Sequence, residues 1–418
     1  MTGSGTLLDP YVIWDVNDLQ AMENDLTAYY ELANDIDASA TVGWNGGLGF
    51  DPVGNRGGSP PDPLRFSGYF NGKGHIISDL FINRPLERFV GLFGITAYGV
   101  TGYIRNVGIV DCNITGQREV GALVGFHEWM IADTDGVISN CYSTGSITGD
   151  RWLIGGLLGY NGALVEDCYS TCDLTISSVT SDITQNGGLI GYNDNKVVRR
   201  CYATGDITVN GANAKDISMI GGLVGMNGNG HGLISQCFAT GNLIITSHVT
   251  GDDTQMIGGL IGFNTGDGCS NSYARGNVSV TPGIDKQKQV GGLVGYNDKA
   301  ILNCYSTGLV TAPGFGFVGG LVGETDWTPG WGSVTDSFWD TEASETLISD
   351  GGTGKTTTEM KTTSTFTDAG WDFDSIWTIN PACNNGYPCL LGVTPSCTKV
   401  PAIPFVINKS YALAREEL

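Results

Sequence analysis

The stretch "GGTGKTTTEMK" at 351–361 is the motif that most resembles a site for chemistry. Gly354, Lys355 and Thr356 resemble the end of the phosphate-binding pattern G-x-x-x-x-G-K-[ST]. That pattern requires glycine five positions before Gly354, and this position holds Ser349. It also requires a buried apolar strand before the loop, whereas "DTEASETLISD" at 340–350 is acidic and only briefly apolar. The stretch therefore does not predict a nucleotide site.

Motifs for carbohydrate chemistry are incomplete. "GHG" at 230–232 matches part of a polygalacturonase signature, but the convenient acidic pair, Asp252 and Asp253, follows His231 and no Arg-x-Lys comes later. Inverting hydrolysis needs two carboxylates roughly 6.5–9.5 Å apart across the sugar, and no such pair recurs with the repeat. A lyase would need Arg or Lys as the base beside a calcium cluster, and these residues are scattered. The sequence therefore predicts no catalytic residue and no enzyme.

Metal and cofactor motifs are equally incomplete. "DTDG" at 133–136 resembles half of a calcium loop but lacks the distal Glu, so we interpret it as an acidic turn and keep calcium only as an alternative. The four histidines stand in unlike contexts, which favours surface or hydrogen-bonded roles. Neither a C-x-x-C pair nor a His/Cys cluster with zinc spacing occurs. We therefore expect no cofactor.

Aromatic residues give a binding hypothesis. Trp129, Trp152, Trp327 and Trp331 lie in longer excursions between repeats. Exposed aromatic rings beside Asp and Asn can bind sugars by stacking and hydrogen bonding, and they can equally serve plain loop packing. These four residues are the candidates for a glycan or surface contact, and loop packing is the alternative.

Composition restricts the partners. The 21 Lys and Arg against 43 Asp and Glu give a net charge of −22, which disfavours nucleic acid. No run of 18 apolar residues occurs, so no membrane insertion is expected. The start has no charged segment followed by an apolar one, so either a signal peptide has been removed or the protein leaves its cell by another route.

One repeat organises the chain of 418 residues, of which 64 are Gly. The first motif recurs eight times, from "GLFG" at 91–94 through "GGLLGYN" at 155–161 to "GGLVGE" at 319–324, at spacings near 33 residues. A second motif follows it, as in "CYSTG" at 141–145 and "CYATG" at 201–205, and a third short strand comes after that. Three short strands in about 33 residues predict one coil of a parallel β-helix.

Stacked coils place like side chains above one another, about 4.8 Å apart. Leucines of the first motif should form an inward ladder, and Asn at the strand end suits a left-handed corner and an amide ladder. The Cys of the second motif could be a column of small buried thiols or could bridge adjacent coils. The expected core ladder comprises Leu123, Leu157, Leu189, Leu223, Leu260, Leu293, Cys141, Cys168, Cys201, Cys237 and Cys304.

The G-[GA]-L-[VIL]-G repeats followed by C-Y-[SA]-T-G resemble the GLUG-motif repeat family over about residues 3–392. "RFSGYFNGKGHIISDLFIN" resembles the family's first coil, and "SFWDTEAS" with "GGTGKTTTEMK" its closing segment. The resemblance implies an all-β, right-handed, single-stranded parallel β-helix with short capping helices at both ends. Such repeats occur in surface and adhesion proteins of bacteria and archaea and in viral proteins, without a shared catalytic residue.

Within this fold the stretch "GGTGKTTTEMK" at 351–361 has a structural role. Thr356 and Glu359 have the spacing of a capping box, so we expect a short helix over "TTTEMK" that covers the open end. "VNDLQAMENDL" at 16–26 has helical spacing and could plug the other end. We expect about eight to ten coils, divided into an N-terminal cap (1–48), a β-helix (49–345), a C-terminal cap (346–392) and an extended tail with a terminal helix (393–418).

The tail suggests attachment. Its Pro-rich start should stay extended, and we expect Phe405, Ile407, Tyr411 and Leu413 to dock on another copy or on a protein of a virion or cell surface; packing back on the solenoid is the alternative. Our leading hypothesis is a non-enzymatic structural or adhesive protein on a virus particle, such as a phage decoration protein or fibre attached through the tail. The alternatives are a secreted bacterial or archaeal surface adhesin and, third, a polysaccharide-active enzyme.

Overall fold

The computed structural model describes residues 1–54, 64–96, 102–128, 136–178, 181–211, 216–228, 230–247, 254–281, 288–314 and 316–395. Trp129, Asp252, Asp253, most of the "DTDG" turn and the four docking residues of the tail lie outside these ranges. The boundaries expected for the four regions stay predictions.

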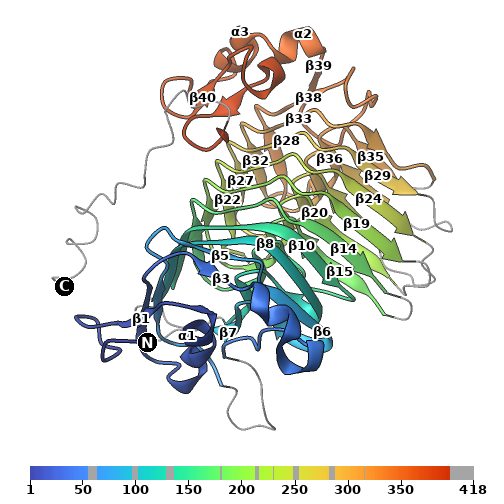
Figure 1. The fold of residues 1–418 in the computed structure, drawn as a ribbon. Helices are drawn as coiled ribbons and strands as arrows, with labels where there is room; N and C mark the ends of the chain where they lie inside the picture. The colour runs from blue at the N-terminus through green and yellow to red at the C-terminus, as the bar shows by residue number, and fades with distance from the viewer. Residues whose placement is uncertain are drawn as a thin grey trace.

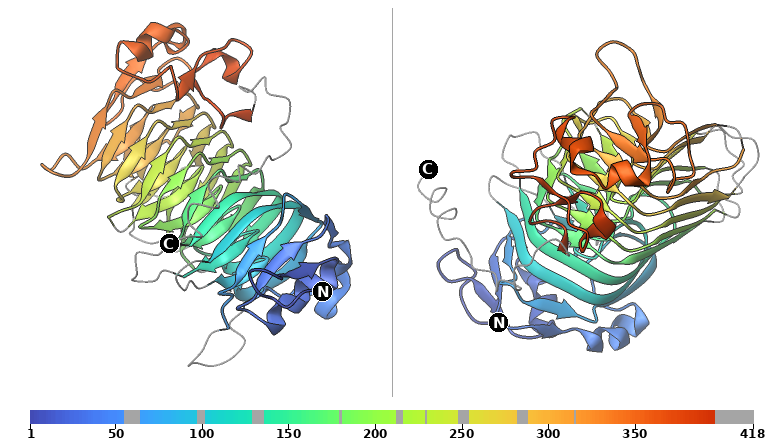
Figure 2. Two further views of the ribbon diagram at one scale, coloured as in Figure 1. Left: turned by 90° about the vertical axis from the view of Figure 1, so that its left-hand side faces the viewer. Right: turned by 90° about the horizontal axis from the view of Figure 1, so that it is seen from above.

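The chain forms an all-β parallel solenoid, as the sequence predicts (Figure 1). Its coils stack along one direction from the blue N-terminal end to the orange C-terminal end in both views of Figure 2. The regular repeat makes about seven turns, slightly fewer than the expected eight to ten coils.

Each first motif contributes one strand of an eight-stranded parallel sheet, so all eight copies are found in register. In stacking order its strands are β7 (Phe93–Thr96), β9 (Val124–His127), β11 (Leu158–Asn161), β16 (Ile190–Asp194), β21 (Val224–Gly228), β26 (Ile261–Asn264), β31 (Val294–Asn297) and β36 (Val322–Thr325). The preceding residues of five coils form a second wall. It consists of β15 (Ile183–Gly187), β20 (Ile217–Gly221), β25 (Gln255–Gly258), β30 (Lys288–Gly291) and β35 (Phe317–Gly319).

The rest of each coil lies in a 26-stranded sheet that turns two corners. The stretch before each second motif forms β12 (Leu164–Glu166), β17 (Val198–Arg199), β22 (Leu233–Ser235), β27 (Gly268–Ser270), β32 (Ala300–Leu302) and β37 (Ser333–Thr335). The stretch after it forms β13 (Tyr169–Ser170), β18 (Tyr202–Ala203), β23 (Phe238–Ala239), β28 (Tyr273–Ala274), β33 (Tyr305–Ser306) and β38 (Phe338–Asp340). The third stretch forms β14 (Asp173–Ser177), β19 (Ile207–Gly211), β24 (Leu243–Ser247), β29 (Val278–Thr281) and β34 (Val310–Thr311).

A complete coil therefore carries five short strands, two more than the motifs predict. The first coils also contribute to the 26-stranded sheet, with strands that are longer or less numerous than those of a complete coil. These are β1 (Tyr11–Ile13), β2 (Tyr29–Leu32), β3 (Ile36–Asp37), β4 (Tyr69–Asn71), β5 (Ile76–Ser78), β6 (Phe81–Val90), β8 (Tyr103–Val120) and β10 (Val137–Gly149).

The N-terminal plug forms where the helical spacing predicts it. Helix α1 (Val16–Gln20) is capped by the Asp15 carboxylate and continues as the 3-10 turn η1 (Ala21–Asn24), and a second 3-10 segment, η2 (Ser39–Gly47), follows later. Leu19 and Met22 are fully buried in the main core, so this helical segment closes the end of the solenoid with apolar side chains.

Expected ladder residues lie in the core. All six leucines and all five cysteines of the predicted ladder are fully buried. Each of these cysteines directs its Sγ toward the carbonyl oxygen two residues earlier, 3.2 Å away, as between Cys201 and Arg199. The eight cysteines from Cys112 to Cys304 are free thiols, and burial raises the pKa of Cys168 and Cys237. The column is therefore one of compact buried thiols.

A polar column runs through the same interior. Asn193 donates from Nδ2 to Asn227 Oδ1 (2.9 Å), and Asn227 donates in turn to Asn264 (3.0 Å). The chain of amides runs from Asn161 to Asn297, so the predicted amide ladder is confirmed. At its N-terminal end the column continues into His127, whose Nδ1 lies 2.9 Å from Thr96 Oγ1. Burial holds the pKa of His127 well below its ordinary value.

The left-handed corners are elsewhere than expected. None of the five laddered Asn residues has a positive φ. One column of left-handed residues instead comes just before the second motif, where the chain turns between two strands of the large sheet. This column comprises Asn140, Asp167, Arg200, Gln236, Asn271, Asn303 and Asp336, with φ between 46° and 55°. Asn and Asp tolerate this conformation best, but Arg200 and Gln236 show that the corner does not depend on them.

In most copies of the first motif the second residue is glycine, because opposite walls of the solenoid meet there; the copy at 121–126 holds the small Ala122 instead. A Cβ built on Gly222 would lie 2.0 Å from the carbonyl oxygen of Gly259 and 3.1 Å from Cβ of Ala239 across the core. The small Ser or Ala of the second motif is thus matched to this glycine.

We expect Gly222→Ala to destabilise the protein by at least about 2 kcal/mol, because the backbone of the next coil would have to move. Urea unfolding followed by circular dichroism measures this change. Gly43→Ala is the matched control, since a Cβ there meets nothing within 4 Å. Equal stability of the two variants would contradict the close-packing explanation.

Acid should weaken the solenoid through His127. The unfolded chain protonates this imidazole below its ordinary pKa of about 6.5, whereas the buried folded form resists protonation, so folding stability falls as pH decreases through that value. His127→Asn, which continues the amide column, should flatten the loss of urea stability between pH 7 and pH 5. The exposed His231→Asn should leave the pH slope unchanged; an identical slope in all three proteins would refute this assignment.

Candidate functional site

The glycine-rich stretch that resembles a phosphate loop is structural. It forms β39 (Thr353–Lys355), the last strand beside β38, and leads into α2 (Thr357–Met360). The capping box is confirmed, because Thr356 Oγ1 accepts from the Glu359 amide (3.3 Å) and the Glu359 carboxylate accepts from the Thr356 amide (2.8 Å). The helix has four residues and its N-terminus is already occupied by this carboxylate, so it offers no phosphate site.

The histidine of the "GHG" motif lies on the surface without a catalytic arrangement. His231 is exposed and its Nδ1 stands 3.7 Å from Asp267. Within the described ranges, no three His, Cys, Asp or Glu side chains come together in a way that could hold a metal ion. No helix in that part of the chain has the length and apolarity needed to span a bilayer.

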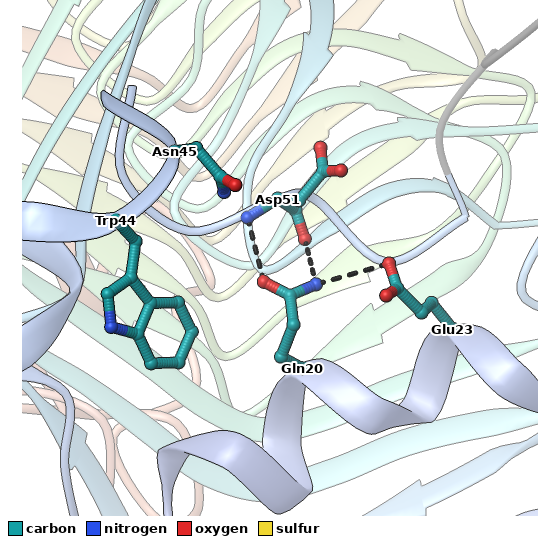
Figure 3. A pocket seen from close by; sticks show the side chains of 5 residues that line it. All are labelled: Gln20, Glu23, Trp44, Asn45 and Asp51. Carbon is teal, nitrogen blue, oxygen red and sulfur yellow. Dashed lines mark hydrogen bonds between the residues drawn. The ribbon is translucent and has the colours of Figure 1, made fainter. Parts of the chain in front are cut away.

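A small pocket lies beside the N-terminal plug (Figure 3). It has a volume of about 280 Å³ and is lined by Gln20, Glu23, Trp44, Asn45 and Asp51. The Gln20 amide is committed to the Asp51 backbone, donating to its carbonyl and accepting from its N–H, both at 2.9 Å. Burial, and then the charge of Asp51, raise the pKa of Glu23. No motif in the sequence marks this pocket, whose polar groups mainly fix the plug against the first coil.

Two of the four candidate tryptophans come together on one loop. Trp327 and Trp331 lie between β36 and β37 and are 55% and 50% exposed. In Figure 2 an orange loop from this part of the chain projects from the stacked coils. Trp152 lies far away in sequence and is partly covered by the Arg118 guanidinium, 4.9 Å from its ring. We name residues 326–332 the tryptophan loop.

Hydrogen bonds hold the tryptophan loop in shape. Trp327 donates from its indole N–H to Asp350 Oδ1 (3.0 Å), and the other carboxylate oxygen of Asp350 accepts from the Thr325 amide (2.7 Å). Lys299 Nζ stands 4.9 Å from the Trp331 ring centroid. Both rings are therefore fixed while about half of each remains in solvent, which suits a preformed contact surface.

A second feature is a stack of rings on the outside of the solenoid, which the motif analysis overlooked. The residue after each Cys of the second motif, or after the Ser272 and Ser337 that replace it, points outward. Successive rings from Tyr142 to Tyr305 lie face to face 4.6–5.0 Å apart and within 9° of parallel. We name this set, with Phe338 in the next coil, the aromatic column. Its members are Tyr142, Tyr169, Tyr202, Phe238, Tyr273, Tyr305 and Phe338. Side chains alternate between the two faces of a strand, so the residue after an inward-facing Cys should face outward. This alternation is the sequence signal that could have revealed the aromatic column.

The C-terminal cap packs on this column. Helices α2 and α3 (Thr363–Thr367), the hairpin of β40 (Trp377–Thr378) and β41 (Cys389–Leu390), and the turn η3 (Asn384–Gly386) build it. Its buried Phe366, Trp371 and Trp377 form one apolar cluster with Tyr305 and Phe338. Helices α2 and α3 lie at the C-terminal end of the stacked coils in Figure 1, and the apolar side chains of the cap also pack on the outward rings of the last coils.

The open end is closed by the segment before the cap. The Gly320 amide donates to Ile348 O (2.9 Å) and the Asp350 amide to Val322 O (3.1 Å). Ser344 O accepts from the Val310 amide (3.2 Å). These bonds satisfy the strand edge of the last coil, and this is the protection that an exposed β edge needs.

Tyr305→Phe should loosen the cap. The fully buried Tyr305 hydroxyl donates to Pro388 O (2.5 Å) and accepts from Asn384 Nδ2 (2.8 Å), so its removal leaves buried polar groups with fewer partners. We expect a loss of roughly 1–3 kcal/mol in urea unfolding and faster proteolysis within residues 357–395. Tyr169→Phe, in the half-buried part of the column, is the control and should change little; equal losses would contradict the role of the hydroxyl.

Comparisons with known proteins agree with the repeat. The GLUG motif matches residues 186–209 and 287–311. Halomucin of Haloquadratum walsbyi is 39% identical over 163 residues, which are 38% of this chain and 2% of that protein. A protein of Evansella cellulosilytica, provisionally named a Gly-rich membrane protein, is 32% identical over 420 aligned positions, covering 92% of this chain and 45% of the relative.

A solved structure from Bacteroides ovatus, provisionally named an immunoglobulin A1 protease, aligns over 93% of this chain and 94% of its own, with 19% identity and a TM-score of 0.49. The chain spans less than half the length of either sequence relative. The chain therefore carries GLUG motifs in two of its repeats, and its eight in-register strands show a parallel β-solenoid.

Proposed function

We propose that this chain is a non-enzymatic structural and adhesive solenoid at a cell surface or outside the cell, and that the tryptophan loop contacts surface glycans. The observation that carries the contact is the pair of half-exposed rings, Trp327 and Trp331, held on one rigid loop. Aromatic faces stack on the apolar faces of sugar rings, and the neighbouring Asp326 and Lys299 supply polar groups.

The relatives favour a cell surface over a virus particle. One is named a halomucin and the other a membrane protein, both from cellular organisms, and neither name refers to a virus. The hypothesis of a phage decoration protein or fibre therefore has no support from them. Each relative is longer than this chain, so the location and partners of the whole protein are part of the proposal.

A structural role suits the described chemistry. Many of its carboxylates are engaged in corners, caps and ion pairs, as in Asp167 with Arg200 (2.7 Å). The net charge of −22 disfavours acidic ligands, so we expect neutral or amine-bearing sugars.

The test is binding of the full-length protein to an array of bacterial and archaeal surface glycans, followed by titration of the strongest neutral or amine-bearing hit. We expect Trp327→Ala and Trp331→Ala each to weaken binding about tenfold, which corresponds to the loss of one stacked ring. Trp14→Ala is the matched control, because Trp14 is 55% exposed at the other end of the molecule. Absence of any glycan bound by the unmodified protein, or an equal loss in the control, would overturn the proposed contact.

A further inference from the structure

The aromatic column is covered along only part of its length. Toward the C-terminal end, Tyr273 and Tyr305 are fully buried beneath the cap, and Phe238 is 2% exposed. In the three preceding coils, Tyr142, Tyr169 and Tyr202 are only half-buried. Stacking and ring spacing are the same in both parts, so the cap interface continues directly into an open row of identical geometry.

The geometry of the column indicates what kind of group covers it. Because neighbouring rings lie face to face, each ring hides the faces of the next and presents its edge and hydroxyl outward. Sugars stack on ring faces, so this row does not suit them. In the covered part a polypeptide meets the edges: Tyr305 donates to Pro388 O (2.5 Å), and the Tyr273 hydroxyl lies 3.1 Å from Thr394 Oγ1.

The described chain ends near the boundary between the covered and open parts. Val393 is buried in the cap cluster, Thr394 contacts Tyr273, and Pro395 is the last residue described. Thr394 therefore stands at Tyr273, with one buried ring, Phe238, between it and the first open ring, Tyr202. From Tyr273 to Tyr142 there are four ring-to-ring steps of 4.6–4.9 Å, roughly 20 Å in all, a span of about six extended residues.

We propose that the apolar stretch 400–407 of the same chain, "VPAIPFVI", packs along the open rings of the aromatic column and so extends the cap interface by up to three coils. The stretch begins five residues after Pro395 and supplies aliphatic and aromatic side chains for the ring edges, with backbone carbonyls as acceptors for the tyrosine hydroxyls. This assigns Phe405 and Ile407 to an intramolecular contact instead of an external partner. The inference is independent of the glycan contact, which rests on the tryptophan loop.

Nitration by tetranitromethane, mapped residue by residue with mass spectrometry, tests the proposal on the full-length protein. Phe405→Asp/Ile407→Asp should increase the nitration rates of Tyr142, Tyr169 and Tyr202 at least about threefold, because the stretch no longer shields them. Tyr296, which lies in the eight-stranded sheet, is the internal reference, and Lys409→Asp is the matched charge control. Unchanged rates at the three tyrosines, or an equal rise in the control, would overturn the proposal.

A photo-cross-linking residue at position 405 identifies the covering chain. We expect links to peptides that contain Tyr169 or Tyr202, within one chain and in a yield independent of protein concentration. Links between two chains that increase with concentration would show that a second copy covers the rings, and links to another wall would show that the stretch lies elsewhere. Either result would overturn the assignment.

Discussion

Parallel, in-register pairing between successive coils is the constraint on which the structure depends. Because each strand is bonded to its copy in the next coil, every side chain stands above its equivalent at the strand spacing of about 4.8 Å. A residue type that stacks favourably with itself therefore stabilises the fold once in every coil. A residue type that stacks poorly destabilises it equally often. This explains a sequence built from few residue types at fixed positions, with Asn, Tyr, Cys, Leu and paired Gly in separate columns.

The residue type of each column determines how its side chains stack on their copies in neighbouring coils. Asn193 and Asn227 can stack inside the core because an amide both donates and accepts, so the column satisfies itself. A buried carboxylate or ammonium group could not do so, since like charges would meet at every coil. His127 fits at the end of the amide column only as a neutral ring. Outside the core, parallel aromatic rings fill the same spacing without any hydrogen bond.

The sequence predicts what is periodic and local. Motif spacing gives the strand of Leu157 and its copies, the amide ladder, and the capping box of Thr356 and Glu359, because each depends on residues in one coil or in one turn. It misses two of the five strands, since pieces such as β17 have only two residues and no alternating pattern. It also misplaces the left-handed corners: Arg200 adopts that conformation because its neighbours in the stack impose it, against its own preference.

Contacts between distant segments could not be inferred in the same way. The cap reaches Tyr273 and Tyr305 from more than 80 positions further along the chain, and no local pattern links the two segments. For the candidate site, the motifs pointed to four tryptophans, but only the fold shows that Trp327 and Trp331 share one loop. The pocket beside Gln20 likewise joins residues brought together by the plug.

The aromatic column does not by itself fix the position of the C-terminal cap, because its rings are nearly identical in every coil. Polar groups beside the rings supply that information. The Trp377 indole donates to Asn271 Oδ1 (3.3 Å), and Arg275 donates to Asn384 O (2.8 Å). One coil earlier the equivalent positions hold Gln236 and Thr240, and the shorter Thr240 side chain could not reach as Arg275 does. The rings thus provide a common apolar surface, while the residues flanking them fix the position of the cap along it.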